Sequence, residues 1–194
     1  MNKFLMNYNR IKNCINFIKF YINIKLTKKR VVLGKNIKIY QNTEIFGIGK
    51  VIIGDKTFLG FRYGGGYRGR NIELQVRKKE AEIILGKNIG INNGLFICCA
   101  GKVEIGDNVL IGSNVTIMDH NAHGIKIEER RTRIGTVKNI EIEKNVWIGN
   151  NVIILPGVKI GENSVIGAGA VVHESIPANK IAYGNPCKIK KNLD

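Results

Sequence analysis

The sequence predicts an all-β solenoid with a helical segment at its N-terminus. The main observation is a six-residue period between Ile142 and Val172, in which every sixth residue is a branched aliphatic. A small or β-branched residue follows four positions after each of these. A period of six is neither the 3.6 of an α-helix nor the plain alternation of one strand, because it also specifies which alternating positions are aliphatic. Such repetition is typical of stacked coils that bury their faces only against their neighbours.

The same period begins near residue 31 and restarts four times on an aliphatic residue followed by glycine: Leu33-Gly34, Ile53-Gly54, Leu85-Gly86 and Ile105-Gly106. Glycine at these points allows a backbone conformation that other residues reach only with strain, so each phrase predicts the corner of a coil. Two stretches, 61–82 and 119–141, interrupt the period. Because insertions in repeat proteins form loops, we expect a loop or hairpin at 61–82, bending at Gly64–Gly66, and a polar loop at 119–141 that holds two of the three histidines.

Residues 1–30 form a separate, strongly basic segment. They contain eight lysines and arginines and no acidic residue, which is half of the formal net charge of +16. Two placements stay open: a helix that packs on the solenoid, capping its end or its neighbour, or a helix that lies on an anionic membrane leaflet. One or two amphipathic helices with a basic opposite face are predicted from apolar side chains at spacings of three and four: Phe4, Tyr8, Ile11, Ile15, Ile18 and Ile22.

Composition excludes several classes of protein. A chain of 194 residues with 44% hydrophobic content is expected to form one globular domain. Polar residues interrupt 11–26 too often for a membrane span, and no secretion signal is recognisable. We therefore expect a cytoplasmic protein, with peripheral contact at the inner membrane face as an open alternative. The basic charge suits an anionic membrane or a phosphorylated small molecule, and we expect no nucleic-acid partner. Four cysteines without metal-site spacing are expected to be thiols: Cys14, Cys98, Cys99 and Cys187.

Three phrases indicate a family. The repeated glycine phrase, the stretch NVWIGNNVIILPGVKIGENSVIGAGAVV and the closing IPANKIAYGNPCKIKK resemble the hexapeptide-repeat acyltransferases. The histidine loop followed by VWIG is similar to the branch of the galactoside, maltose and polysaccharide O-acetyltransferases. The resemblance covers about residues 31–191. It implies a left-handed parallel β-helix over 31–183, a tail at 184–194 that closes over the coenzyme, and a homotrimer with active sites between subunits. It also implies acetyl-CoA as co-substrate and no metal.

The histidines of the 119–141 loop are the candidate catalytic residues. Moving an acetyl group from a thioester to a hydroxyl needs a base, a donor for the developing oxyanion and aligned substrates. Histidine is the side chain best suited to be that base at neutral pH. We favour His120 as the base, with His123 as the alternative. Asp119, which precedes His120, is expected to contact the acceptor. His173 stands at a corner of the regular array and is expected to be structural.

The resemblance also implies binding residues. Asn92, with Asn93 as its alternate, would contact the acceptor sugar, although an asparagine at a coil corner could equally close a turn. Trp147 is expected to face outwards, where it would line the cleft for acetyl-CoA and acceptor or else pack on a neighbouring subunit. The remaining residues expected to contact the cofactor are small residues near the outer surface and C-terminal lysines that could meet its phosphates: Gly149, Gly167, Ala168, Gly169, Lys188, Lys190 and Lys191.

The leading function is an acetyl-CoA-dependent O-acetyltransferase that acts on a sugar hydroxyl of a surface-polysaccharide or glycolipid precursor by direct, histidine-assisted transfer. The alternative within the same chemistry is an N-acetyltransferase for a nucleotide-linked amino sugar or an antibiotic. A γ-class carbonic anhydrase would need three histidines on zinc, and His120 and His123 are too close in one loop for that arrangement. A scaffolding solenoid without chemistry would need no histidine loop.

Overall fold

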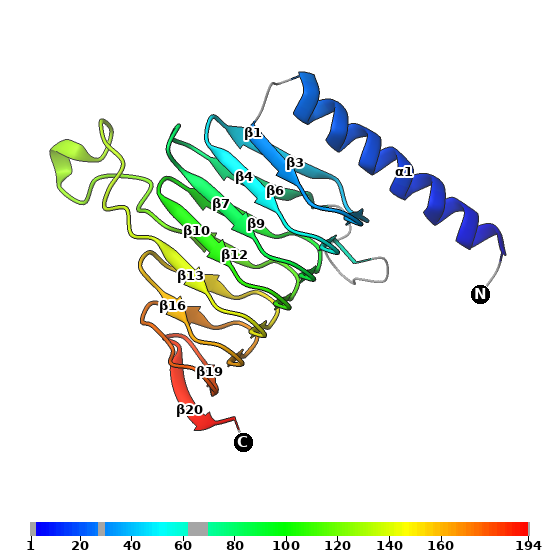
Figure 1. The fold of residues 1–194 in the computed structure, drawn as a ribbon. Helices are drawn as coiled ribbons and strands as arrows, with labels where there is room; N and C mark the ends of the chain where they lie inside the picture. Colours follow the sequence, from blue (N-terminus) through cyan, green and yellow to red (C-terminus); the bar gives the residue numbers. More distant parts are fainter. Residues whose placement is uncertain (1–2, 27–29, 62–69, 194) are drawn as a thin grey trace.

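The computed structural model describes residues 3–26, 30–61 and 70–193, and in the N-terminal helix it describes the side chains of Ile11 and of residues 14–25. Helix α1 (Lys3–Leu26) is followed by a stack of β-coils that runs from the blue strands to the red C-terminal ones in Figure 1. Each regular coil contributes one strand to each of three sheets, which we call A, B and C in chain order. The predicted left-handed parallel β-helix is confirmed.

The three sheets are parallel except at the C-terminal end, where β19 and β20 pair antiparallel. Sheet A contains β1 (Arg30–Leu33), β4 (Lys50–Ile53), β7 (Glu82–Leu85), β10 (Lys102–Ile105), β13 (Ile140–Ile142) and β16 (Lys159–Ile160). Sheet B contains β2 (Lys38–Ile39), β5 (Phe58–Leu59), β8 (Gly90–Ile91), β11 (Leu110–Ile111), β14 (Trp147–Ile148), β17 (Val165–Ile166), β19 (Lys180–Tyr183) and β20 (Lys188–Asn192). Sheet C contains β3 (Thr43–Gly47), β6 (Ile72–Val76), β9 (Phe96–Cys99), β12 (Thr116–Met118), β15 (Ile153–Ile154) and β18 (Val171–Val172).

The core of the stack is made of the residues that the six-residue period selects. From Ile142 to Val172 every sixth residue is at most 1% exposed, and the residues four positions later are buried as well. The register explains this, because each strand pairs with the strand of the next coil so that equivalent residues lie directly above one another, as Ile111 does with Ile148. Each aliphatic row therefore runs through the stack as one continuous core.

Asparagines close the corners between sheets A and B. Asn108, Asn145 and Asn163 adopt φ values of 61°, 60° and 62°, a left-handed conformation that asparagine tolerates better than most residues. Their side chains also form a ladder along the stack. Asn108 Nδ2 donates to Asn145 Oδ1 at 3.2 Å, and Asn145 Nδ2 donates to Asn163 Oδ1 at 3.1 Å.

Asn145 offers a test of this corner. Asn145→Ala should lower the free energy of unfolding by about 1–2 kcal/mol, because alanine keeps the strained φ and loses both ladder bonds. Asn145→Gly should lower the free energy of unfolding by less, because glycine adopts this φ without strain although it also lacks the amide side chain. Urea unfolding of both variants distinguishes the two contributions. Equal stability of the alanine variant and the unsubstituted protein would mean that the corner does not constrain the backbone.

The first interruption is shorter than predicted. Residues 72–76 form β6, whose alternately buried side chains pair with β3 and β9, and β7 begins at Glu82. The prediction was wrong there because this coil lacks the glycine phrase, and alternation over only five residues was hidden by charged neighbours. The predicted bend at Gly64–Gly66 lies outside the described residues. The second interruption does form a loop, which leaves the stack after β12, contains the 3₁₀ turn η1 (Ile127–Glu129) and returns at β13 (Figure 1).

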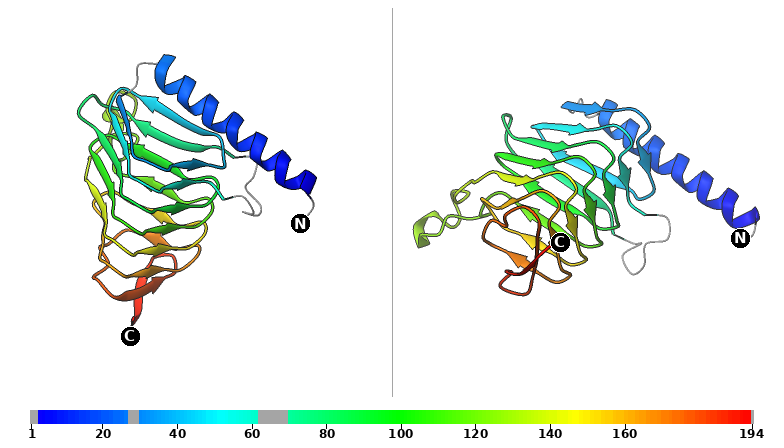
Figure 2. Two further views of the ribbon diagram at one scale, coloured as in Figure 1. Left: turned by 45° about the vertical axis from the view of Figure 1, so that its right-hand side comes forward. Right: turned by 60° about the horizontal axis from the view of Figure 1, so that its bottom comes forward.

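Helix α1 packs on the first coils with an unexpected face. It contacts β2 and β3 through Phe20, which is 1% exposed, and through Asn16, whose Nδ2 donates to the carbonyl of Tyr40 at 3.2 Å. The predicted apolar stripe points elsewhere, since Ile15 and Ile18 are about half exposed. Figure 2 shows the same arrangement from two further directions, with α1 at one end of the stack and its N-terminus reaching past the coils.

Candidate active site

Asp119 and His120 form a buried pair where β12 leaves sheet C. The side chain of Asp119 points into the coil and is completely buried, while His120 is 3% exposed. His120 is covered because the returning end of the loop forms an antiparallel bridge with it at Val137. The two side chains meet at 2.8 Å, between His120 Nδ1 and Asp119 Oδ1. The adjacency of these residues in sequence thus becomes a direct contact.

The carboxylate of Asp119 is held by the turn that follows β9. Its Oδ1 accepts the backbone N–H of Ala100 at 2.8 Å, and its Oδ2 accepts that of Gly101 at 2.7 Å. The Cys99 thiol donates to Oδ2 at 3.3 Å, and burial, together with the nearby carboxylate, raises the pKa of this thiol. With these donors and the imidazole, the carboxylate has one fixed orientation. Because a carboxylate oxygen accepts from it, His120 Nδ1 carries the proton and Nε2 is left as the basic nitrogen.

The basic nitrogen of His120 faces strand β9. Cys98 Sγ lies 3.9 Å from His120 Nε2 and donates to Gln75 Oε1 at 3.3 Å. Burial raises the pKa of the Cys98 thiol, which favours this donating, protonated form. Cys98 therefore connects the imidazole to side chains on the outer surface of sheet C.

Those side chains border a cavity of about 520 Å³ on sheet C, lined by Phe46, Gly47, Glu73, Gln75 and Arg77. Arg77 donates to Gln75 Oε1 from Nε and Nη2 at 3.2 and 3.0 Å, and Gln75 Nε2 donates to Glu73 Oε1. The cavity thus offers a guanidinium, an amide and a carboxylate in one row. His120 does not line it, and reaches it through Cys98.

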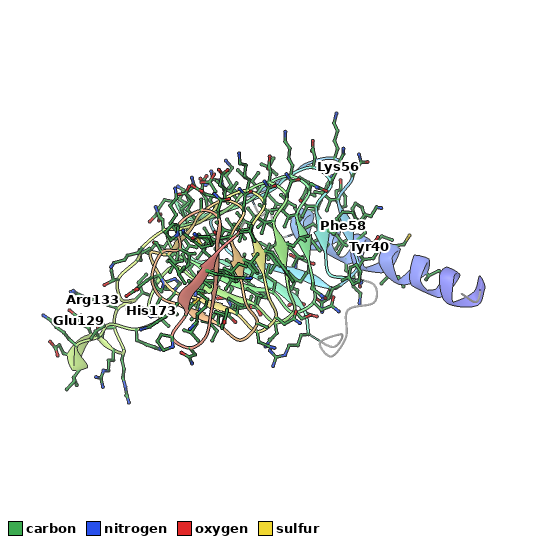
Figure 3. All side chains as sticks on the ribbon, turned by 90° about the horizontal axis from the view of Figure 1, so that it is seen from below. Tyr40, Lys56, Phe58, Glu129, Arg133 and His173 are labelled. Atoms are coloured by element: carbon green, nitrogen blue, oxygen red, sulfur yellow. The ribbon has the colours of Figure 1, made fainter. Side chains whose placement is uncertain are left out.

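His123 lies apart from this pair. It is exposed on the loop, and because a carbonyl can only accept, its Nδ1 donates to the carbonyl of Arg130 at 2.7 Å. Glu129 and Arg133, from the same loop, are seen in Figure 3 on the opposite side of the molecule from α1. His173 is exposed and lies 3.9 Å from Glu174. Of the three histidines, His120 has a buried, carboxylate-oriented ring.

A second, apolar cavity of about 350 Å³ lies on the outer surface of sheet B. Trp147 faces outwards there, as predicted, and is 55% exposed. Phe58, Leu110 and Asn92 line the same cavity. In the register of sheet B, Leu110 pairs with Trp147, so these apolar side chains form one row along the stack. Figure 3 shows Phe58 beside Tyr40, and the two rings stack at a centroid separation of 6.3 Å.

The two predicted asparagines close the corner between sheets B and C. Asn92 Oδ1 accepts the backbone N–H of Asn93 at 2.8 Å, which is the turn-closing role. Asn93 is 3% exposed, and its Oδ1 accepts the N–H of Phe61 at 2.9 Å, so it anchors the chain where the first interruption begins. Only Asn92 also borders the apolar cavity.

The predicted cofactor residues occupy the same corner and the end of sheet B. A Cβ added at Gly149 would lie 2.6 Å from the Ala168 nitrogen, and one at Gly167 would lie 2.6 Å from Tyr183 Cβ, so close stacking of coils requires these glycines. Gly169 has open space around it and a φ of +73°. Lys188 and Lys191 are exposed on β20.

Within one chain the predicted site residues therefore fall into two groups. Asp119 and His120 lie at the corner between sheets C and A, whereas Trp147 lies on sheet B and Gly149 at the corner between B and C. The width of sheet C separates the groups. Sequence reasoning missed Glu73, Gln75, Arg77 and Cys98, which the alternation of β6 and β9 places on the outer surface of sheet C.

Among the described residues, no group of histidine, cysteine and carboxylate side chains is arranged to hold a metal ion. In the same part of the chain no helix is both long and apolar enough to span a bilayer.

Two hexapeptide family models match the chain. The bacterial transferase hexapeptide (six repeats) covers residues 139–174, and the hexapeptide repeat of succinyl-transferase covers residues 102–130. A galactoside O-acetyltransferase of Lactococcus lactis is 35% identical over 142 residues, which are 73% of this chain and 63% of that protein. The chain thus spans less than two thirds of the length of this relative.

Solved structures agree with these matches. A galactoside acetyltransferase in complex with coenzyme A is 25% identical with a TM-score of 0.58, covering 100% of this chain and 84% of that one. A hexapeptide-repeat acetyltransferase from Vibrio cholerae complexed with acetyl coenzyme A is also 25% identical with a TM-score of 0.58, over 90% and 76% of the two chains.

Proposed function

We propose that this chain belongs to the hexapeptide-repeat acyltransferases, in the branch that contains the galactoside O-acetyltransferases, and that it transfers an acetyl group from acetyl-CoA to a sugar hydroxyl. The buried Asp119–His120 pair carries this proposal. Its imidazole has a fixed tautomer with Nε2 directed to the outer side of sheet C, as a general base requires.

The proposed reaction is direct. His120 Nε2 takes the proton of the acceptor hydroxyl while the oxygen of that hydroxyl attacks the thioester carbonyl carbon, giving a tetrahedral oxyanion. Collapse of this intermediate breaks the carbon–sulfur bond, and the imidazolium returns the proton to the departing thiolate of coenzyme A. Asp119 positions the ring and stabilises its positive charge. No covalent intermediate on the protein is needed.

We place the acceptor in the cavity on sheet C. The guanidinium of Arg77 and the carboxylate of Glu73 supply fixed donors and acceptors, which is the pattern that binds hydroxyl groups. Gln75 of this cavity accepts from Cys98, whose Sγ lies 3.9 Å from His120 Nε2. We therefore expect the acetylated hydroxyl to lie beside Cys98, within hydrogen-bond reach of Nε2.

We place acetyl-CoA along sheet B, with Trp147 in the cleft and Lys188 and Lys191 near the phosphates. Relatives of known structure that hold coenzyme A or acetyl coenzyme A support the choice of donor. The residues that we expect to contact acetyl-CoA lie at one edge of sheet C, and His120 lies at the opposite edge. A complete site therefore needs sheet B of a second copy of the chain beside His120.

A homotrimer meets this requirement. The outer surface of sheet A carries ion pairs, Lys50–Glu82 at 3.5 Å and Lys159–Glu143 at 2.7 Å, and we expect it to remain exposed to solvent. Sheet B instead exposes Trp147 and Leu110, which favours burial against another subunit. We expect light scattering to give three times the mass of the chain; a monomer that is fully active would contradict the shared site.

The acceptor class is tested with matched pairs of sugars. We expect the protein to consume acetyl-CoA with hydroxyl acceptors of polysaccharide or glycolipid precursors, and to react poorly with the corresponding amino sugars. Release of free coenzyme A gives the rate, and mass spectrometry of the product gives the linkage. Exclusive reaction with the amines would replace this proposal with the N-acetyltransferase alternative. Peripheral contact of residues 1–30 with an anionic membrane, at the cytoplasmic face, belongs to the same proposal for a lipid-linked acceptor.

A further inference from the structure

Helix α1 presents an apolar stripe to the outside of the molecule. Ile11, Ile15, Ile18 and Ile22 are 61%, 45%, 54% and 47% exposed, and their spacings of four, three and four place them on one side of the helix. Phe20, on the other side, is buried against the coils. The helix is therefore anchored to its own β-helix through one face and leaves its most regular apolar face uncovered.

Cationic side chains border this stripe. Lys19 and Lys25 are exposed, and Lys25 Nζ lies 5.2 Å from the ring centroid of Tyr21. Tyr21 in turn stacks on Phe17 at a centroid separation of 6.4 Å. The sequence from 1 to 30 contains eight lysines and arginines without one carboxylate. Long basic side chains beside an apolar stripe can extend to phosphate groups while the stripe enters a less polar layer.

The charge decides which occupant fits. A heptad-like isoleucine stripe could pair with the same stripe of a second copy, but homotypic pairing would bring together helices that carry only positive charge. An anionic lipid surface attracts those charges and accepts the isoleucines among its acyl chains. A spanning orientation is not supported, because α1 is not apolar enough to cross a bilayer.

We propose that α1 lies in the interface of an anionic bilayer, with Ile11, Ile15, Ile18 and Ile22 inserted and the flanking lysines at the phosphates. The helix extends past the edge of the stack (Figure 1), so the stripe can reach a flat surface while Phe20 keeps the β-helix attached on the water side. The proposal does not depend on the chemistry at His120. Its further role, holding sheet C close to lipid-linked acceptors, rests on the proposed function.

The test measures binding of the full-length protein to vesicles by flotation. We expect binding to vesicles of phosphatidylglycerol and phosphatidylcholine, and at least about tenfold weaker binding to phosphatidylcholine alone, because the attraction is largely electrostatic. Ile15→Asp/Ile18→Asp should lower binding to the anionic vesicles at least about tenfold by placing charges within the inserted stripe. Absence of binding to the anionic vesicles, or equal binding to both kinds, would overturn the proposal.

Two controls separate this surface from other effects. Ile125→Asp/Ile127→Asp changes side chains that are 72% and 79% exposed on the loop at the other side of the molecule, and should bind vesicles like the unsubstituted protein. Ile15→Asp/Ile18→Asp should keep its mass in vesicle-free solution and its acetyl transfer to a soluble acceptor. A change of mass in that variant would identify the stripe as an interface between copies and overturn the proposal. Failure of acetyl transfer in every protein, with vesicle binding intact, would affect only the proposed function.

Discussion

His120→Ala is expected to lower kcat by about 10²–10⁴-fold, which is the contribution usual for a general base. The alanine variant removes the imidazole Nε2 that faces Cys98 on the outer side of sheet C, and the other two histidines, His123 and His173, are exposed. Asp119 keeps its bonds to Ala100 and Gly101, so the corner should remain folded. Steady-state rates at saturating acetyl-CoA, with coenzyme A affinity measured by calorimetry, separate loss of chemistry from loss of binding.

His123→Ala is the matched control, since it removes a histidine of the same loop that only donates to the carbonyl of Arg130. We expect its kcat to stay within a few-fold of the unsubstituted protein. A result with the two variants reversed would move the base to His123. If neither variant loses activity, general-base catalysis by this loop is wrong.

The regular coils were predictable because the six-residue period is itself the physical requirement of the stack. Each aliphatic row must lie at the same height in successive coils, so Ile148, Ile154 and Ile160 are read directly as core. Strand β6 was not predictable from the period. Its buried residues alternate with polar ones over only five positions, and the glycine phrase that marks the other coils is missing. The orientation of α1 was hidden for a different reason. An apolar stripe indicates a face that leaves water, and does not indicate whether protein or lipid covers it.

The buried Asp119–His120 pair of the candidate site could be expected from the sequence, but the side chains around it could not. Of the two histidines in the loop, the sequence favoured His120 because Asp119 precedes it, and this is the histidine whose ring the structure buries against a carboxylate. Alternation in an extended segment turns one side chain inwards and the next outwards. Cys98 and Gln75 come from coils that precede the histidine by 22 and 45 positions, and only the inter-coil register brings them to it. Trp147 was correctly expected to face outwards, but its distance from His120 in a complete site depends on the trimer that we propose.

Asp119→Asn is expected to damage both stability and turnover. The amide keeps one acceptor oxygen and turns an NH₂ group towards the backbone N–H of Ala100 or Gly101, so one buried donor loses its partner. This should lower the free energy of unfolding by about 1–3 kcal/mol. The lost negative charge also leaves the imidazolium without its counter-charge, and kcat should fall by about 10²–10⁴-fold. Urea unfolding and steady-state kinetics measure the two effects on the same preparation.

Asp107→Asn is the control, because Asp107 Oδ1 also accepts a backbone N–H across a coil corner, that of Lys87 at 2.7 Å, but on an exposed corner between sheets A and B. It should cost at most about 1 kcal/mol and leave kcat unchanged. The difference between the two variants separates the effect that Asp119 has on turnover through His120 from the stability that it contributes by closing a turn. In the acetyl-transfer mechanism a purely structural Asp119 would lower stability without lowering the kcat of the folded fraction. That outcome would contradict the orienting role, whereas a fall in kcat with an unchanged KM for acetyl-CoA would support it.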